Sequence, residues 1–174
     1  ITADLCAAPG GKAMALAELM GGGTLVASDS SFDRQKKTVE NFAKSGFGNI
    51  SLVVSNDGMA FKESSFDAIL LDVPCSNTGV GRHKPDALWR FSIPRLNGII
   101  KDQKRILYGA AKLLKPGGRL VYSTCSIETE ENSAQVKKFI SEKPQYVLKE
   151  EKFILPSETN DGAYIALVEK ETTV

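Results

Sequence analysis

The sequence contains little of the material from which metal centres and disulfide frameworks are built. Its 174 residues include three cysteines (Cys6, Cys75 and Cys125) and a single histidine, His83. Structural metal sites and small disulfide-bonded domains need more of these residues, at regular spacings. We therefore predict neither a metal site nor disulfides, and a reducing cytoplasm is the simplest setting.

Long apolar runs and an excess of one charge are also missing. No segment reaches the ~18 apolar residues that a membrane-spanning helix needs, and no signal peptide is visible. The net charge of +1 neither supports nor excludes nucleic acid as a partner. With 42% hydrophobic residues, the chain suits one soluble domain, expected to be monomeric. It starts directly with a core strand, which suggests a fragment of a longer protein.

The most informative stretch is DLCAAPGGK, residues 4–12. It links an apolar run at 1–6, typical of a buried strand, to a helix-forming segment that ends near Met20. Glycines let the backbone approach a ligand, and free amides at a helix start face it. The pattern is neither G-x-G-x-x-G nor G-x-x-x-x-G-K-[ST], which weakens a phosphate-binding interpretation. A nucleoside cofactor without phosphates, such as S-adenosylmethionine, remains open, as does a turn without any ligand.

Strand-like and helix-like segments alternate along the rest of the chain. Strands are predicted at 24–28, 50–54, 66–71 and 119–124, helices at 31–44, 96–114 and 128–143, and a long loop at 73–94. Two more strands fall within 146–169, with Asn160–Gly162 as the hairpin signal. Alternating apolar strands and helices indicate a parallel sheet. The predicted fold is α/β, with a mostly parallel seven-stranded sheet and a C-terminal antiparallel hairpin.

Two predicted helices have side chains with an expected orientation. The apolar stripe expected to face the sheet from the helix at 31–44 consists of Phe32, Val39, Phe42 and Ala43. The helix at 128–143 opens with three acidic residues suited to its positive end, namely Glu128, Glu130 and Glu131.

Polar residues gather where the predicted strands end, which is where parallel sheets bind ligands. Asp29 follows the glycines at a spacing typical of residues that bind ribose hydroxyls; the alternative is a cap for the next helix. Asp57 can accept a hydrogen bond from an adenine amino group, or serve simply as a turn residue before Gly58.

Cys75 and Cys125 both lie where a core strand opens into a loop, each next to a serine. A buried cysteine is usually a small hydrophobe, and we keep that interpretation for Cys6 from its position alone. Two thiols at two strand ends instead suggest a catalytic role. In methylation of pyrimidine carbon 5, a thiolate adds to carbon 6, and Asp72 can protonate or hydrogen-bond ring N3. Carbon 5 then attacks the cofactor's methyl group. Spacing leaves open which cysteine attacks.

The sequence resembles the RNA (cytosine-5) methyltransferases of the Sun/Fmu (RsmB) and Nop2/NSUN type. The matching motifs run in family order: D-x-C-A-A-P-G-G-K at 4–12, Asp29, Asp57, D-x-P-C-S at 72–76, Thr78–Gly79, Arg82, Pro85, Trp89, S-T-C-S at 123–126 and D-G-A-Y-I-A at 161–166. Ala13 stands where threonine is common and Asn77 where the family usually has glycine. Family members also carry further N-terminal sequence.

The resemblance implies a Rossmann-like, S-adenosylmethionine-dependent catalytic domain over residues 1–174. It implies that the cofactor is held by Cys6, Ala7, Ala8, Pro9, Gly10, Gly11, Lys12, Asp29, Asp57 and Asp72. It also implies that Cys125 is the nucleophile and that Cys75 assists product release, with Asp72 as the third catalytic residue.

A basic segment favours RNA, and ribosomal RNA in particular through the resemblance. Residues 82–105 contain seven lysines and arginines against two aspartates. Basic side chains bind phosphates, and an aromatic ring can stack on an exposed base. The predicted RNA contacts are Arg82, Lys84, Trp89 and Arg90; the alternative is a solvated helix face with Trp89 in the core. The target cytidine must be single-stranded or flipped out.

Two other functions remain possible from the sequence. Methylation of a nitrogen on RNA or protein needs no thiol, so it would survive the removal of Cys125. A non-catalytic module would bind cofactor or RNA without transferring a methyl group.

Overall fold

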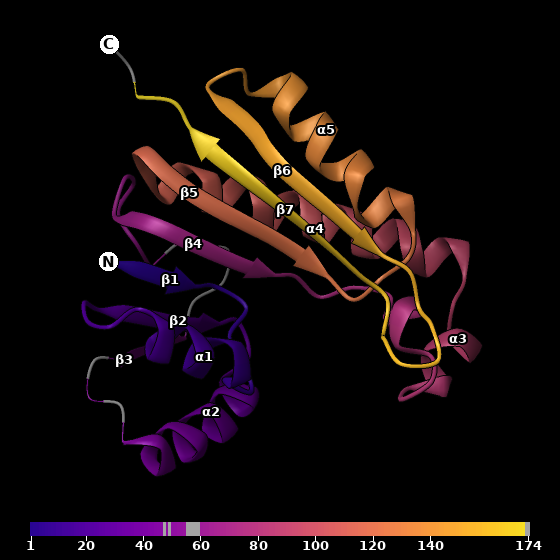
Figure 1. Ribbon diagram of the computed structural model, residues 1–174, viewed down its shortest axis with the longest axis horizontal. Coiled ribbons are helices and arrows are strands. Elements are labelled where there is room, and N and C mark those ends of the chain that lie inside the picture. The colour runs from indigo at the N-terminus through magenta and orange to yellow at the C-terminus, as the bar shows by residue number, and fades with distance from the viewer. Residues whose placement is uncertain (47, 49, 55–59, 173–174) are drawn as a thin grey trace.

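A computed structural model describes residues 1–46, 48, 50–54 and 60–172, and it shows a single seven-stranded sheet (Figure 1). The strand order is β3-β2-β1-β4-β5-β7-β6. The strands are β1 Thr2–Asp4, β2 Leu25–Asp29, β3 Ile50–Val54, β4 Phe66–Asp72, β5 Leu114–Thr124, β6 Tyr146–Ile154 and β7 Ala163–Lys170. Strands β1 to β5 are parallel, and β7 runs antiparallel to β5 and β6, which confirms the predicted fold.

Helices α1 and α2 pack near β2 and β3, whereas α4 and α5 lie along β4, β5 and β6 (Figure 1). The helices are α1 Gly11–Leu19, α2 Phe32–Ser45, α3 Pro85–Trp89, α4 Ile93–Leu113 and α5 Ser133–Glu142, with 3₁₀ turns η1 Thr78–Val80 and η2 Thr129–Glu131. The larger apolar core lies between the central strands and α4 and α5, and includes Leu71, Leu107, Leu120 and Phe139. Within the described part of the chain, no helix is both long and apolar enough to cross a bilayer.

The inward face of α2 differs from the prediction. Gln35, Thr38 and Phe42 are its buried residues, while Phe32 and Val39 are 65% and 50% exposed. Gln35 can be buried because its side-chain amide donates to the carbonyl of Ala27 on β2, at 3.1 Å. The spacing 35-38-42 places these three side chains on one helical face. The predicted stripe was therefore right for Phe42 and wrong for Phe32, Val39 and Ala43, which are exposed.

Several predicted boundaries also shift. The expected loop at 73–94 contains η1 and α3, and α4 begins at Ile93 because Pro94 fits the first helical turn, where no amide donor is needed. Strand β5 begins at Leu114, and an irregularity in its pairing with β4 absorbs the Pro-Gly-Gly segment. Strand β1 ends at Asp4. The β6–β7 connection spans 155–162, longer than the tight turn that Asn160–Gly162 suggested.

Candidate active site

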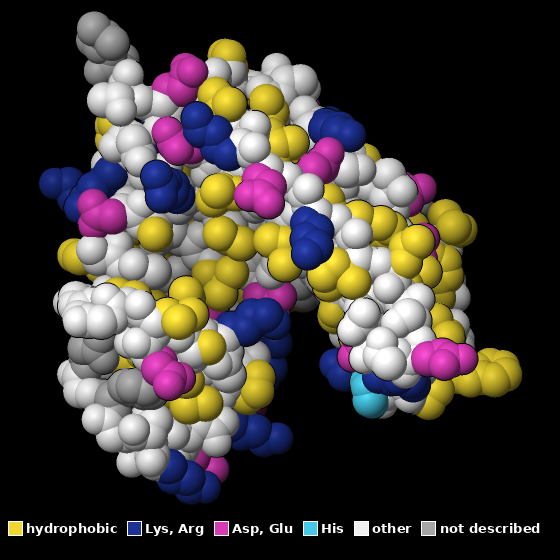
Figure 2. Space-filling model, in the orientation of Figure 1, with side chains coloured by type: hydrophobic (Ala, Val, Ile, Leu, Met, Phe, Trp, Pro, Cys, Tyr) yellow, Lys and Arg dark blue, Asp and Glu magenta, His cyan; other side chains and the backbone are white. Residues whose placement is uncertain are grey.

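The carboxyl ends of β1, β4 and β5 lie side by side and bring the predicted loops together. In the register, Asp4 pairs with Leu70, and Asp72 pairs with Ser123. Figure 2 shows a hollow between the part of the molecule that holds α1 and α2 and the part that holds α3. The glycine loop and both cysteine loops therefore meet at one edge of the sheet, as the sequence predicted.

Asp72 connects the glycine loop to the end of β5. Its Oδ2 atom lies 2.6 Å from Lys12 Nζ, and its Oδ1 atom accepts a hydrogen bond from Ser123 Oγ at 2.9 Å. The side chain is about one-third exposed, at 33%. A carboxylate held by two donors from different segments is fixed in direction but remains open to a ligand.

The glycine loop is packed against α2 and tied to β2. Gly10 has φ 106°, and a Cβ there would lie 3.0 Å from the ring of Phe42, so this left-handed position suits glycine alone. The amide of Ala8 donates to Asp29 Oδ2 at 3.2 Å. Helix α1 follows with no side-chain cap at its start, which leaves its first amides available to a ligand.

Asp29 is buried and organises the second strand end. Its Oδ1 atom accepts hydrogen bonds from Ser31 N at 2.9 Å and from Arg34 Nη2 at 2.7 Å. The cap of α2 is Ser31, whose Oγ accepts from Arg34 N, so the capping alternative for Asp29 is wrong. Asp29 is instead joined to the glycine loop by the hydrogen bond that it accepts from the amide of Ala8. The predicted adenine contact, Asp57, lies outside the described residues.

Asp4 is a buried carboxyl at the start of the glycine loop. Its Oδ1 atom accepts from Cys6 N at 3.2 Å, whereas no hydrogen bond reaches Oδ2 from the described residues. Burial raises the pKa of Asp4 to about 7, partly opposed by the Cys6 amide. The same burial, with the neighbouring carboxylates, raises the pKa of Cys6, so that its thiol stays neutral.

This shift gives a pH-dependent stability prediction for Asp4→Asn. The pKa of Asp4 in the folded state lies above its value in the unfolded chain. The stability that the protonated Asp4 carboxyl group contributes is therefore complete only below pH ~4, and it is lost as the pH rises to about 7. The asparagine side chain of Asp4→Asn does not ionise, so the variant does not lose this stability as the pH rises. We expect Asp4→Asn to raise the free energy of unfolding relative to native by up to ~4 kcal/mol above pH 7 and by little at pH 4.

Urea unfolding between pH 4 and 8 measures this difference. Asp86→Asn, at an exposed aspartate of α3, is the matched control and should change stability little at any pH. Equal effects of Asp4→Asn at both ends of the pH range would contradict a raised pKa.

The thiols of Cys75 and Cys125 face each other, with 3.1 Å between their sulfur atoms. Hydrogen bonding from Cys75 lowers the pKa of Cys125, helped by the nearby Lys84 ammonium, and the same contact raises the pKa of Cys75. Asn77 Oδ1 lies 3.1 Å from Cys125 Sγ and accepts from Lys84 Nζ at 3.4 Å. The Cys75 thiol is thus placed to donate to a thiolate at Cys125.

Asn77 holds this arrangement in a backbone conformation that most residues avoid. Its φ is 62°, a left-handed value that asparagine tolerates better than most other side chains. Its Nδ2 donates to the carbonyl of Cys75 at 2.9 Å, which turns Oδ1 toward Cys125. Asparagine thus takes a position that the resembling family gives to glycine, and its side chain adds hydrogen bonds with Cys75, Cys125 and Lys84.

Sequence reasoning missed the polar cluster behind the two cysteine loops. Glu131, expected among the acidic residues that open a helix, is completely buried in η2 and accepts from Ser126 Oγ at 2.7 Å. Gln103 donates to the same carboxylate at 2.8 Å. A glutamine inside the apolar stripe of α4 was the available signal, because a buried amide needs a partner. Nothing in the local sequence distinguishes Glu131 from Glu128 or Glu130.

Comparison with known proteins identifies the family. The model of the family described as 16S rRNA methyltransferase RsmB/F matches residues 1–168. The chain belongs to this family. Ribosomal RNA small subunit methyltransferase B of Salmonella arizonae is 40% identical over 151 residues, covering 84% of this chain and 35% of that protein. Methyltransferase F of Klebsiella pneumoniae is 40% identical over 148 residues, covering 83% and 31%.

A solved structure agrees with this assignment to the RsmB/F family. NSun6 from Pyrococcus horikoshii, determined with SFG, has a TM-score of 0.86 and 29% identity, covering 99% of this chain and 48% of that one. The family is one of S-adenosylmethionine-dependent methyltransferases, which confirms the cofactor class expected from the sequence. The chain spans 28–42% of the length of the RsmB/F relatives that it matches.

The residues predicted to contact RNA lie on the segment that carries η1 and α3. Lys84 lies near Cys125, while Arg82 donates to the carbonyl of Glu158 in the β6–β7 connection. Arg90 lies 3.7 Å from Asp86 on α3. Trp89 is 88% exposed, so the alternative that placed it in the core is wrong. This RsmB/F chain therefore presents an aromatic ring to solvent on a segment that is rich in basic residues.

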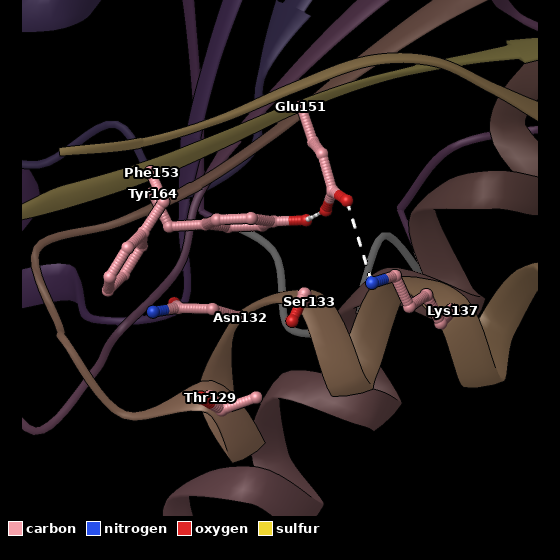
Figure 3. Close-up of a pocket in the computed structure, with 7 residues that line it drawn as sticks. All are labelled: Thr129, Asn132, Ser133, Lys137, Glu151, Phe153 and Tyr164. Atoms are coloured by element: carbon pink, nitrogen blue, oxygen red, sulfur yellow. Dashed lines mark hydrogen bonds and ion pairs between the residues drawn. The ribbon is translucent and has the colours of Figure 1, made fainter.

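A separate pocket of about 310 Å³ lies between α5 and the β6–β7 hairpin (Figure 3). Tyr164 donates to Glu151 at 2.7 Å, and Lys137 lies 3.6 Å from the same carboxylate. The other lining residues are Thr129, Asn132, Ser133 and Phe153. Because its lining includes none of the predicted site residues, this pocket is not part of the candidate active site.

Proposed function

We propose that this chain is the catalytic domain of an RNA methyltransferase that modifies carbon 5 of cytidine in 16S ribosomal RNA through a covalent bond to Cys125. One observation carries the proposal: two thiols, 3.1 Å apart, lie at the ends of β4 and β5 beside Asp72. Nitrogen methylation requires no thiol, whereas carbon-5 methylation requires a thiolate to activate the ring.

The glycine loop fits a nucleoside cofactor. The uncapped start of α1 offers amide donors, the Cβ position of Gly11 is open, and the buried Oδ2 of Asp4 has no hydrogen-bond partner among the described residues. Residues 6–12 with Asp29 and Asp72 would hold S-adenosylmethionine, which supplies an electrophilic methyl group when bound. Asp57 is proposed as a further contact on the strength of the resemblance alone.

Cys125 starts the reaction. Its thiolate forms a bond to carbon 6, and the electron pair of the 5,6 double bond moves toward ring N3, which takes a proton or a hydrogen bond from the Asp72 carboxyl group in its protonated form. Lys12 and Ser123 hold Asp72 in place through both of its oxygens. Carbon 5 thereby becomes nucleophilic enough to take the methyl group.

Cys75 helps to end the reaction. Water removes the carbon-5 proton, and the electron pair of that C–H bond re-forms the 5,6 double bond. The carbon 6–sulfur bond breaks, its electron pair returns to Cys125, and ring N3 gives its proton back to Asp72. The Cys75 thiol can donate a hydrogen bond to this departing sulfur, because the contact between them already exists. RNA would lie across the hollow, with its phosphates on Arg82, Lys84 and Arg90 and an unpaired base stacked on Trp89.

RNA substituted with 5-fluorocytidine tests the proposal, with the full-length protein and S-adenosylmethionine. Fluorine at carbon 5 prevents elimination, so an attacking thiol stays bonded to the RNA. We expect a denaturation-resistant adduct in the native protein and in Cys75→Ala, and none in Cys125→Ala. Loss of the adduct only in Cys75→Ala would reverse the two roles. Methyl transfer that survives in Cys125→Ala, with no adduct in any form, would favour nitrogen methylation, whereas cofactor binding without transfer would indicate a non-catalytic module.

A further inference from the structure

Glu131 is a completely buried carboxylate that joins the two cysteine loops. Its Oε1 atom accepts from Ser126 Oγ at 2.7 Å, and its Oε2 atom accepts from the backbone amide of Ser76 at 2.9 Å. Ser76 follows Cys75 at the end of β4, and Ser126 follows Cys125 at the end of β5. One rigid group therefore fixes the residue next to each thiol.

The glutamate is itself fixed from several sides. Gln103 on α4 donates to Oε2 at 2.8 Å and also to the carbonyl of Pro74 at 3.0 Å, so the Cys75 loop is held at 74 and at 76. The carbonyl of Glu131 accepts from Tyr122 OH at 2.7 Å, which anchors η2 to β5. Hydrogen bonds to a buried carboxylate are strong, and losing the acceptor leaves its donors unsatisfied.

We propose that Glu131 is a positioning residue, which sets the separation of the Cys75 and Cys125 thiols and thereby the reactivity of Cys125. This inference deepens the proposed function and rests on it. Glu131 touches neither sulfur; it acts through the backbone amide of Ser76 and the hydroxyl of Ser126. If Oε2 is removed, the Ser76 amide loses the acceptor that the described residues give it. The Cys75 loop then keeps the bonds from Gln103 to Pro74, from Asn77 to Cys75 and between the Ser76 and Ser126 hydroxyls, but the separation of Cys75 from Cys125 is less firmly set.

The pKa of Cys125 depends on the distance between the two thiols. The groups that face it are Cys75 and Asp72 at the end of β4 and Lys84 before α3. The hydrogen bond from Cys75 is the largest influence and lowers the pKa of Cys125, Lys84 acts in the same direction, and Asp72 opposes them. Loss of the Cys75 contact must therefore raise the pH at which Cys125 becomes a thiolate.

The test is iodoacetamide alkylation of Cys125 as a function of pH in the full-length protein, with each thiol assigned by peptide mass spectrometry. Neither RNA nor cofactor is needed. We expect Glu131→Ala to shift the alkylation profile upward by about one pH unit, which makes alkylation at neutral pH about tenfold slower. Cys75→Ala should shift it as far, and the double variant no further, because both changes remove the same hydrogen bond.

Two conservative variants separate positioning from a general loss of structure. Glu131→Gln can accept from Ser76 and Gln103 while its amide donates to the Ser126 hydroxyl, so we expect a nearly native profile. Glu131→Asp keeps the charge but is one methylene shorter and cannot reach both loops, so an upward shift is expected even if Glu131→Ala does not fold. Glu142→Ala is the matched control: that glutamate bonds Tyr108 and Lys104 away from the cysteines.

The outcomes distinguish this inference from the proposed function. Additive shifts in Glu131→Ala and Cys75→Ala, or an unshifted profile in both Glu131→Ala and Glu131→Asp, would overturn positioning, whatever the RNA adduct shows. If the profile shifts as expected while native protein forms no 5-fluorocytidine adduct, the positioning role stands and the proposed chemistry fails. A shift in Glu142→Ala equal to that in Glu131→Ala would mean that general destabilisation is the cause.

Discussion

Asp72→Asn is expected to slow methyl transfer by about 10²- to 10⁴-fold, a larger effect than any loss of cofactor affinity. General acid catalysis contributes about this much to a reaction. The amide oxygen can still accept from Ser123, which donates to Asp72 Oδ1 at 2.9 Å, although the contact of Oδ2 with Lys12 at 2.6 Å is lost. It cannot transfer a proton to ring N3, and the charge that develops on thiol addition would be poorly stabilised.

Asp67→Asn provides a matched control on the same strand. Asp67 lies at the opposite end of β4 and pairs with Lys115 at 2.8 Å, as Asp72 pairs with Lys12, but it is exposed and remote from the cysteines. Single-turnover methyl transfer and calorimetric cofactor binding measure the two effects separately. An Asp72→Asn rate within a few-fold of native would remove Asp72 from the chemistry. Weakened cofactor binding alone would assign it to the cofactor site.

Gly79→Ala is expected to destabilise the fold by about 3 kcal/mol and to displace Cys125. A Cβ at Gly79 would lie 2.6 Å from the carbonyl oxygen of Gly162 and 2.8 Å from that of Cys125, and both are backbone atoms that cannot rotate away. The amide of Gly79 donates to the Cys125 carbonyl at 3.0 Å, and its own carbonyl accepts from Gly162 N at 2.8 Å. The added methyl group would break this three-segment junction.

Gly98→Ala is the corresponding control, because Gly98 lies on the exposed face of α4 and a Cβ there meets nothing within 4 Å. Alanine in a helix is favoured over glycine, so this variant should be stabilised by about 0.5–1 kcal/mol. Urea unfolding of both variants measures the difference, and alkylation of Cys125 detects its displacement. A Gly79→Ala variant with the same free energy of unfolding as Gly98→Ala would show that the junction accommodates the methyl group without loss of stability.

The motifs at strand ends were predictable because they follow from chain order. Parallel strands that alternate with helices must end at the same edge of the sheet, so residues after each strand meet there. The contacts of Lys12 with Asp72 and of Cys75 with Cys125 follow from this rule. Single apolar residues on a surface helix did not predict which of its faces is buried. Phe32 and Val39 of α2 are exposed, and Gln35 and Thr38 take buried positions.

The sequence by itself determined the family, the α/β sheet with its final antiparallel strands, and which loops meet at the edge of the sheet where the candidate site lies. These features rest on local patterns: apolar periodicity, glycine turns and motifs in a fixed order. The tertiary structure alone decided which polar groups are buried and what they hold. Glu131 and Glu130 are adjacent in the chain, yet only the packing of α4, β4 and β5 makes one of them the shared acceptor of two cysteine loops. Burial and hydrogen-bond partners depend on segments far apart in sequence, and no local pattern encodes them.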